Sequence, residues 1–136
     1  MIIGFTGTRD GVTEPQFDAL SSLLAKYQPE EVHHGDCVGA DVSFHSAAMC
    51  ETEARIVTHP PKVESMRAVC VGTRTTILPA KDYLERNKDI VNSSDLLIAC
   101  PKGPEERRSG TWSTVRYARK VGKPVVVVWP DGRVEE

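Results

Sequence analysis

The segment Arg108-Ser109-Gly110-Thr111-Trp112-Ser113-Thr114 decides the fold, because it joins a strand pattern to a helix pattern through one glycine turn. The apolar run Leu96–Ala99 before it is short, which is typical of a buried strand. The side chains after it that are spaced for one buried helix face are Trp112, Val115, Ala118 and Val121. The first amides of a helix have no internal partner, so this turn is a candidate phosphate site. Ser109 acting only as a helix cap is the alternative.

Outward from this segment, the chain alternates strand patterns with helix patterns. Short runs typical of strands cover Ile2–Thr6, Glu31–His34, Ala54–Thr58, Leu96–Cys100 and Val125–Trp129. Helix patterns follow the first, second and fourth runs, and another covers Tyr83–Val91. A capping box at Thr13–Gln16 begins the first helix, and Gly122 ends the last. The alternation predicts an α/β fold in which a mainly parallel sheet of about five strands has helices on both faces.

Spacing and composition also predict which residues the second helix buries and which segments of the chain are irregular. The expected inner face of the second helix is Val42, His45, Ala48 and Met49. The third helix is predicted from the spacing of Tyr83, Leu84, Asn87, Ile90 and Val91. The segment His59–Pro79 is expected to be irregular, either as a binding loop or lid or as a mobile segment. Val125–Trp129 is apolar on both faces, which predicts a central strand, and Arg133–Glu136 is expected to fray.

Three glycine-containing turns follow the first, second and fourth predicted strands. They are Gly7-Thr8-Arg9, the stretch Gly35–Asp41, and Ser109-Gly110-Thr111. Parallel strands present their carboxyl ends at one edge of a sheet, and ligands bind in the crevice beyond that edge. Arg9 is suited to bind phosphate with two hydrogen bonds, while Asp41 suits either a helix start or a ligand hydroxyl. We therefore expect one ligand site built from all three turns.

Composition limits the function classes. The chain has 136 residues with a net charge of −2, which gives no global case for nucleic-acid or membrane binding. No apolar run has the length of a membrane span, and the N-terminus lacks the pattern of a secretory signal, so a cytoplasmic location is expected. The four cysteines and four histidines show no zinc-ligand spacing, and no metal is expected. His33 and His34 are expected to point to opposite faces of their strand.

Three stretches together resemble the Rossmann-like domain of the DNA-processing protein A (DprA/Smf) family. They are Gly4–Arg9, His34–Asp41 with His45, and Arg108–Ala118 followed by Gly122-Lys123-Pro124-Val125. The superfamily, often called SLOG, also contains the "lonely guy" phosphoribohydrolases and small stand-alone nucleotide-binding proteins. The Arg86-Asn87 pair and the His59-Pro60-Pro61 stretch are most similar to the stand-alone members. The resemblance implies a single Rossmann-like three-layer α/β/α domain over residues 1–136.

The resemblance also implies a pocket for a nucleotide or a nucleotide-derived ligand, with phosphate at the Gly110-Thr111 amides. No separate cofactor is expected, and a homodimer or higher homo-oligomer is expected by family analogy. The expected ligand-binding residues are Gly7, Thr8, Arg9, Gly35, Asp36, Gly39, Asp41, Arg86, Asn87, Ser109, Gly110, Thr111 and Thr114.

Two other activities remain as alternatives, and catalytic turnover is left open. The phosphoribohydrolases carry a glutamate in a P-G-G-x-G-T-x-x-E motif, and Thr114 stands at that position here. Threonine is no base near neutral pH, so an N-glycosidic hydrolase would need a carboxylate from elsewhere. The candidates are Glu105, Glu106, Asp36 and Asp41, and spacing favours none of them. The second alternative is single-stranded DNA binding, as in the DNA-processing relatives, through a basic set that includes Arg116, Arg119 and Lys120.

Overall fold

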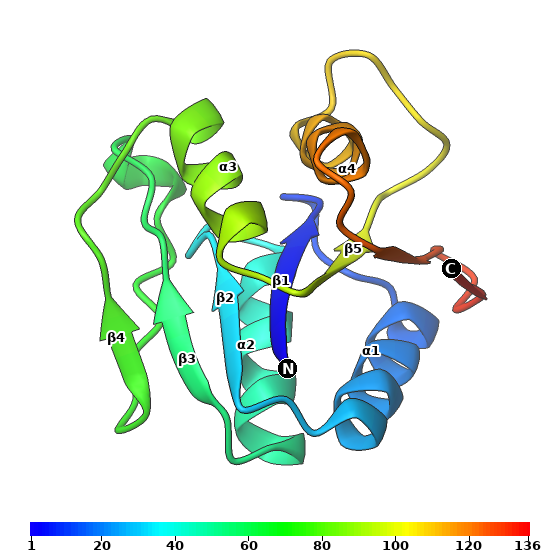
Figure 1. Cartoon of the computed structure of the whole chain (residues 1–136), viewed down its shortest axis with the longest axis horizontal. Coiled ribbons are helices and arrows are strands. Elements are labelled where there is room, and N and C mark those ends of the chain that lie inside the picture. The colour runs from blue at the N-terminus through cyan, green and yellow to red at the C-terminus, as the bar shows by residue number, and fades with distance from the viewer.

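One seven-stranded sheet forms the centre of the computed structural model, which describes all residues from 1 to 136 (Figure 1). The strand order is β4-β3-β2-β1-β5-β6-β7, parallel throughout except for the antiparallel β7. The strands are β1 (Ile2–Gly7), β2 (Glu31–His34), β3 (Arg55–Thr58), β4 (Thr75–Ile77), β5 (Leu96–Cys100), β6 (Val125–Val128) and β7 (Val134–Glu135). The sheet is therefore larger than the predicted five strands, and its doubly wound order is Rossmann-like.

Four α-helices cover the two faces of the sheet, which gives the predicted three layers (Figure 1). The helices are α1 (Glu14–Tyr27), α2 (Ala40–Glu51), α3 (Tyr83–Asn92) and α4 (Gly110–Lys120), with a short 3₁₀ turn η1 at Glu64–Met66. Helices α1 and α2 pack together on one face, and α3 and α4 pack together on the other. The longest of these helices has 14 residues, and none has the length and hydropathy needed to cross a bilayer.

Local sequence signals account for the helix ends. Thr13 and Gln16 form the predicted capping box, in which each side chain accepts the backbone amide of the other residue. Ser109 caps α4 by accepting the Trp112 amide. Gly122 follows α4 with φ of 82°, a left-handed conformation that glycine adopts without strain.

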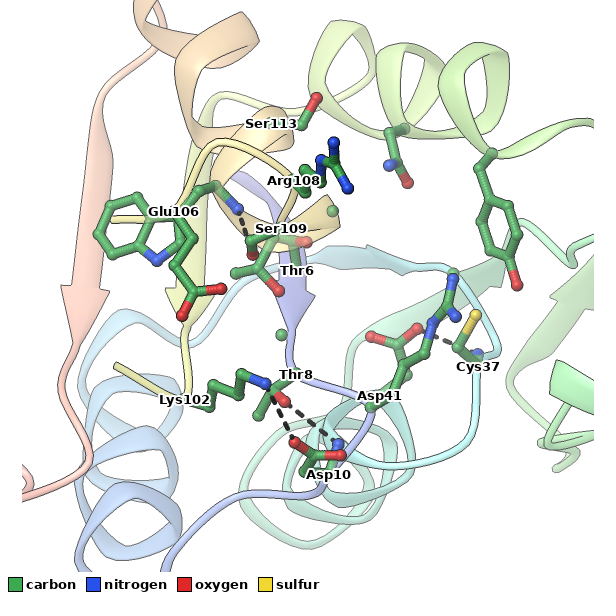
Figure 2. Close-up of a pocket in the computed structure, with 18 of the residues that line it drawn as sticks. Thr6, Thr8, Asp10, Cys37, Asp41, Lys102, Glu106, Arg108, Ser109 and Ser113 are labelled. Atoms are coloured by element: carbon green, nitrogen blue, oxygen red, sulfur yellow. Dashed lines mark hydrogen bonds and ion pairs between the residues drawn. The ribbon is translucent and has the colours of Figure 1, made fainter. Parts of the chain in front are cut away.

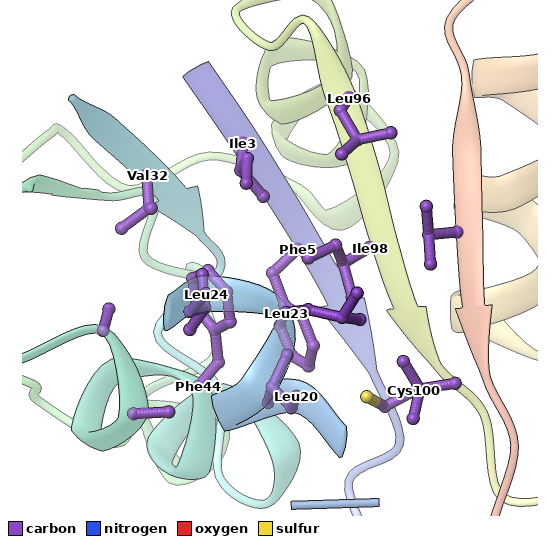
Figure 3. Packing of buried hydrophobic residues seen from close by; sticks show 14 of the residues in the cluster. Ile3, Phe5, Leu20, Leu23, Leu24, Val32, Phe44, Leu96, Ile98 and Cys100 are labelled. Atoms are coloured by element: carbon purple, nitrogen blue, oxygen red, sulfur yellow. The ribbon is translucent and has the colours of Figure 1, made fainter. Parts of the chain in front are cut away.

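The larger core lies between the sheet and the pair α1 and α2 (Figure 3). Phe5 of β1 stacks on Phe44 of α2, with ring centroids 4.4 Å apart. Leu20 and Leu24 of α1 are fully buried in the same layer. A smaller core on the opposite face contains Trp112 of α4, together with the β5 side chains that point to that face. β5 contributes buried side chains to both cores, whereas β1 contributes Ile3 and Phe5 to the larger one.

Several expected core side chains lie elsewhere. Val42 and Met49 of α2 are exposed, because the helix turns Phe44 and Ala47 to the sheet instead. Leu84 of α3 is 69% exposed, and the buried polar residue of that helix is Arg86. Val121 is also exposed, because it caps α4 after its last full turn.

The two segments expected to lack regular structure contain strands. Within His59–Pro79, β4 pairs with β3 at the sheet edge, and Arg74 secures it by donating to the carbonyl oxygens of Thr52 and Ala54. The tail expected to fray contains β7, which pairs with β6. The strand predicted at Val125–Trp129 is β6, which is parallel to β5, has β7 on its other side and buries Val126, Val127 and Val128.

Candidate functional site

A pocket of about 580 Å³ opens at the carboxyl edge of the sheet (Figure 2). Its floor is the end of β1, where Gly7 lies opposite Cys100 of β5. One wall is the loop from Lys102 to Ser109 with the start of α4, and another comes from α3 and the turn after β2. Only six of the 25 lining residues are hydrophobic, so the pocket suits a polar ligand rather than an apolar one.

The N-terminus of α4 supplies unpaired amides to this pocket. The Ser109 hydroxyl accepts the Trp112 amide at 3.2 Å, and the Ser109 carbonyl accepts the Ser113 amide at 2.9 Å. The amides of Gly110 and Thr111 donate to no acceptor within the protein. Gly110 has open space where a Cβ would stand, so a ligand can approach its backbone closely. The helix dipole adds partial positive charge at the same point, which favours a bound anion.

Cationic side chains outnumber acidic ones around the pocket. The cations are Arg9, Arg86, Lys102, Arg107 and Arg108, and the acids are Asp10, Asp41 and Glu106. One pair is internal to the site, since Lys102 Nζ lies 3.7 Å from Asp10 Oδ2. Arg9, Arg107 and Arg108 form no ion pair. The remaining positive charge attracts an anionic ligand.

Arg86 is the buried cation of the site, with only 6% of its surface exposed. Its Nη1 donates to the carbonyl oxygen of Gly35 at 2.6 Å and to that of His59 at 3.2 Å. Its Nε donates to Asn87 Oδ1 at 2.9 Å. These bonds fix the guanidinium at the ends of β2 and β3, which lie in succession on one side of β1. A Cβ at position 35 would overlap the Arg86 guanidinium, so any larger residue there would displace this side chain.

Asp41 is the buried acid of the site. It lies in the first turn of α2, and its Oδ2 accepts the Cys37 amide at 3.0 Å (Figure 2). Burial raises the pKa of this carboxyl to about 6, although the Cys37 amide and the nearby Arg86 charge both oppose the shift. Figure 2 shows Asp41 and Cys37 on the opposite side of the pocket from Arg108 and Ser109.

Ten of the thirteen residues that the sequence suggested for the ligand line this pocket. They are Gly7, Thr8, Arg9, Gly35, Asp41, Arg86, Asn87, Ser109, Gly110 and Thr111. Their convergence from three turns and α3 follows from the parallel register of β1, β2 and β5.

The other three expected residues, Asp36, Gly39 and Thr114, do not line the pocket. Asp36 has φ of 51° and turns its carboxylate away, toward Arg67 Nε at 3.2 Å and the Cys70 amide at 2.7 Å. Gly39 underlies Arg9, because a Cβ at Gly39 would overlap the Arg9 backbone. Thr114 is buried and donates its hydroxyl to the Gly110 carbonyl at 2.9 Å. All three residues lie outside the pocket lining and contact the segments next to it.

Two buried histidine chains lie beside the site, one on each face of β2, as strand alternation predicts. His33 contacts Glu31 and His59, at 2.8 Å each. His34 contacts His45, with Nε2 2.9 Å from Nδ1.

The second chain includes a cluster with the geometry of a metal site, since donor atoms of His34, His45 and Cys70 lie within 4.8 Å of one another. His34 Nδ1 accepts the Asp36 amide, so neutral His34 carries its proton on Nε2 and donates it to His45. His45 in turn donates from Nε2 to the Val71 carbonyl at 3.1 Å. Burial lowers the pKa of His34 well below its usual value, which keeps this ring neutral. Hydrogen bonding therefore accounts for both imidazoles without a metal ion.

Sequence reasoning missed pocket residues on the loop after β5 and at the start of α3. Lys102, Arg107 and Arg108 belong to that loop. The sequence placed Arg107 and Arg108 in the basic set considered for DNA binding, although their position just before a phosphate-type helix start was a signal for the ligand site. Tyr83 lies one turn before Arg86, with its ring centroid 5.0 Å from the Arg86 guanidinium and 4.8 Å from that of Arg9. The sequence used Tyr83 only to predict the helix, and no local pattern marks its place in the pocket.

Comparison with known proteins places this geometry in a structural class. No protein-family model matches the sequence, and no curated protein matches it either. Among solved structures, the chain is similar to the molybdenum cofactor binding protein from the phototrophic bacterium Rippkaea orientalis. The TM-score is 0.70 at 26% identity, over 94% of this chain and 76% of that one.

A second solved structure has the same fold at lower identity. It is the structural genomics target TM1055, with a TM-score of 0.62 at 17% identity, over 91% of this chain and 71% of that one. Together with the strand order, these similarities establish a Rossmann-like α/β fold.

Proposed function

We propose that this protein binds a phosphorylated small molecule of the nucleotide or nucleotide-derived class, with phosphate at the start of α4. The observation that supports this most is the pair of unpaired amides at Gly110 and Thr111, which open into a polar pocket rich in arginine. A phosphate accepts several hydrogen bonds and carries the charge that the helix dipole and the arginines favour. The resemblance to SLOG proteins in the sequence supports the same class of ligand.

The similarity to the Rippkaea orientalis protein is compatible with this class. That protein is described as binding the molybdenum cofactor. A small-molecule ligand bound by a protein of this fold is compatible with the nucleotide-derived ligand that we propose here.

Calorimetric titration with matched ligand pairs tests this proposal. Each pair consists of a 5′-nucleotide and the nucleoside that lacks its phosphate, for example adenosine 5′-monophosphate and adenosine. We expect the phosphorylated member to bind and the other to bind at least tenfold more weakly, since it loses the contacts at α4. Equal affinity of both members, or no binding of any phosphorylated compound, would contradict the proposal.

N-glycosidic hydrolysis is the second candidate function, and Asp41 is the observation that favours it. A pocket-lining carboxyl with its pKa raised to about 6 exchanges protons near neutral pH, as a general acid or base must. Chromatography of the titration mixtures separates the two functions. Released base that disappears in an Asp41→Asn variant would establish hydrolysis, whereas intact ligand would establish binding alone.

A further inference from the structure

Arg86 carries a buried positive charge that no carboxylate neutralises at ion-pair distance. All of its hydrogen-bond acceptors are uncharged: the carbonyl oxygens of Gly35 and His59, the Asn87 amide oxygen, and the Cys37 sulfur at 3.6 Å. The nearby carboxylate of Asp41 is instead hydrogen-bonded to the Cys37 amide. An unpaired charge that is 94% buried is costly, because the guanidinium has given up most of its hydration.

The unused part of the Arg86 guanidinium faces the pocket. Its Nη2 donates to no protein acceptor and is not among the fully enclosed polar atoms that lack a partner. Arg86 and Arg9 both line the pocket, and both guanidinium groups lie against the Tyr83 ring. Arg9 is exposed and forms no ion pair, so its charge is also available on this side.

This charged cluster lies across the pocket from the start of α4, because Arg86 Nη1 is 3.6 Å from Cys37 Sγ and Cys37 lies on the opposite side from Ser109 (Figure 2). It is built on α3 and on the ends of β1 and β2, whereas the helix amides follow β5. We propose that Arg86 and Arg9 form a second anion subsite, so that the ligand carries two separated anionic groups. One group is the phosphate at Gly110 and Thr111, and the other is a second phosphate or a carboxylate at Arg86. The inference rests on the proposed function, and it narrows the ligand class to dianionic molecules.

Amide-detected NMR titration with inorganic phosphate tests whether two subsites exist. We expect two groups of amide signals to shift with different affinities: Gly110 and Thr111 in one group, and Gly35 and Cys37 in the other. An Arg86→Gln variant is expected to lose the second group of shifts and to keep the first. Shifts confined to Gly110 and Thr111 would overturn the second subsite and leave the proposed function standing. No shift in either group would contradict both.

Linked dianions provide an independent measurement. Bisphosphate esters of linear diols with two to six carbons are compared by calorimetry with the monophosphate ester of the same chain. At the length that spans both subsites, we expect the bisphosphate to bind at least about tenfold more tightly, because the second contact becomes intramolecular. Bisphosphates that bind no more tightly than the monophosphates at any length would overturn the proposal.

Two variants make this comparison specific. Arg86→Gln is expected to abolish the gain, whereas Arg119→Gln is expected to retain it, since Arg119 is exposed on the last turn of α4. If Arg86→Gln prevents folding, Arg9→Gln serves instead, because its exposed side chain makes no hydrogen bond or ion pair. If the folded Arg86→Gln or Arg9→Gln variant still binds the bisphosphate as much more tightly than the monophosphate as the unmodified protein does, the second subsite is contradicted.

Discussion

Gly39 lies where the loop after β1 crosses the start of α2. Its φ is 95°, and a Cβ there would overlap the backbone of Arg9. The crossing is fixed further by the Ala40 amide, which donates to the Thr8 carbonyl at 2.9 Å. A residue outside the pocket therefore sets where Arg9 stands inside it. No sequence pattern shows this role, because the contact joins two turns that are distant along the chain.

Substitution of Gly39 by alanine should weaken both stability and ligand binding. The left-handed backbone and the overlap together predict a loss of about 1–3 kcal/mol in the free energy of unfolding. Urea denaturation measures that loss, and calorimetry with a 5′-nucleotide measures the binding. Gly103→Ala is the matched control, since Gly103 also lines the pocket but has open space at its Cβ position. Unchanged stability of the Gly39→Ala variant would show that the Arg9 loop moves freely.

Asp41 predicts how anion binding depends on pH. With a pKa of about 6, the carboxyl is neutral below that pH and negative above it, where it repels a bound anion. We therefore expect sulfate, which does not titrate in this range, to bind roughly three- to tenfold more tightly at pH 5 than at pH 7.5. The Asp41→Asn variant should remove most of that difference in a calorimetric titration. If the affinity for sulfate depended on pH equally in both proteins, the pH dependence would come from a titratable group other than Asp41.

At the scale of elements, α4 has two roles that one substitution can separate. Ser109 caps the helix through its hydroxyl, and its neighbours Gly110 and Thr111 present the free amides. Aspartate caps a helix start as well as serine does, and its charge suits the helix dipole. The same charge would stand beside the bound phosphate.

The Ser109→Asp variant should therefore keep the stability of the protein and lose phosphate-dependent binding. Ser109→Ala should do the opposite: it should keep phosphate-dependent binding and lose about 1 kcal/mol in the free energy of unfolding, because the helix cap is missing. Thermal denaturation and calorimetry on both variants measure the two effects. If the Ser109→Asp variant retained its affinity for nucleotides, the phosphate would have to bind somewhere other than the start of α4.

The elements also show how far the sequence alone predicts this fold. Five of the seven strands and all four α-helices were predictable, because runs such as Leu96–Cys100 and caps such as Ser109 are local signals. β4 was missed because it is short, polar and formed by pairing with β3. The inner face of α2 was half predicted, since His45 and Ala48 are buried whereas Val42 and Met49 are exposed. Apolar side chains occur around much of that helix, and the stacking of Phe44 on Phe5 selects the inner face.

For the site, the sequence predicted the residues that the three glycine turns contribute. It did not predict side-chain orientations that depend on contacts between distant parts of the chain. The three glycine turns converge because parallel strands end at one edge. The opposite orientation of Asp36 depends on its left-handed backbone and on Arg67, which is 31 residues away in sequence. Homo-oligomer formation stays a prediction from the resemblance.

At the scale of the whole molecule, buried histidines couple stability to pH. Burial and the neighbouring His33 lower the pKa of His59 to about 4, whereas the unfolded residue titrates near 6.5. The unfolded chain therefore binds more protons between these values, and the free energy of unfolding falls as pH drops from 6.5 to 4.

His59→Gln should reduce this pH dependence. Glutamine cannot take up a proton, but its amide can still hydrogen-bond to His33. Between pH 7 and pH 4, the free energy of unfolding should therefore fall by about 2 kcal/mol less in the variant than in the unmodified protein. Urea denaturation at both pH values measures the difference. Parallel pH profiles for the two proteins would show that His59 is already protonated in the fold, or that its burial is relieved below neutral pH.

The most direct test of the central claim is a crystal soaked with tungstate, an oxyanion that substitutes for phosphate and is located by its anomalous scattering. The account predicts an anomalous peak within hydrogen-bond reach of the Gly110 and Thr111 amides, which disappears in crystals of the Ser109→Asp variant. A pocket without a peak at the start of α4, or peaks only at surface lysines and arginines, would contradict the claim that this helix binds phosphate.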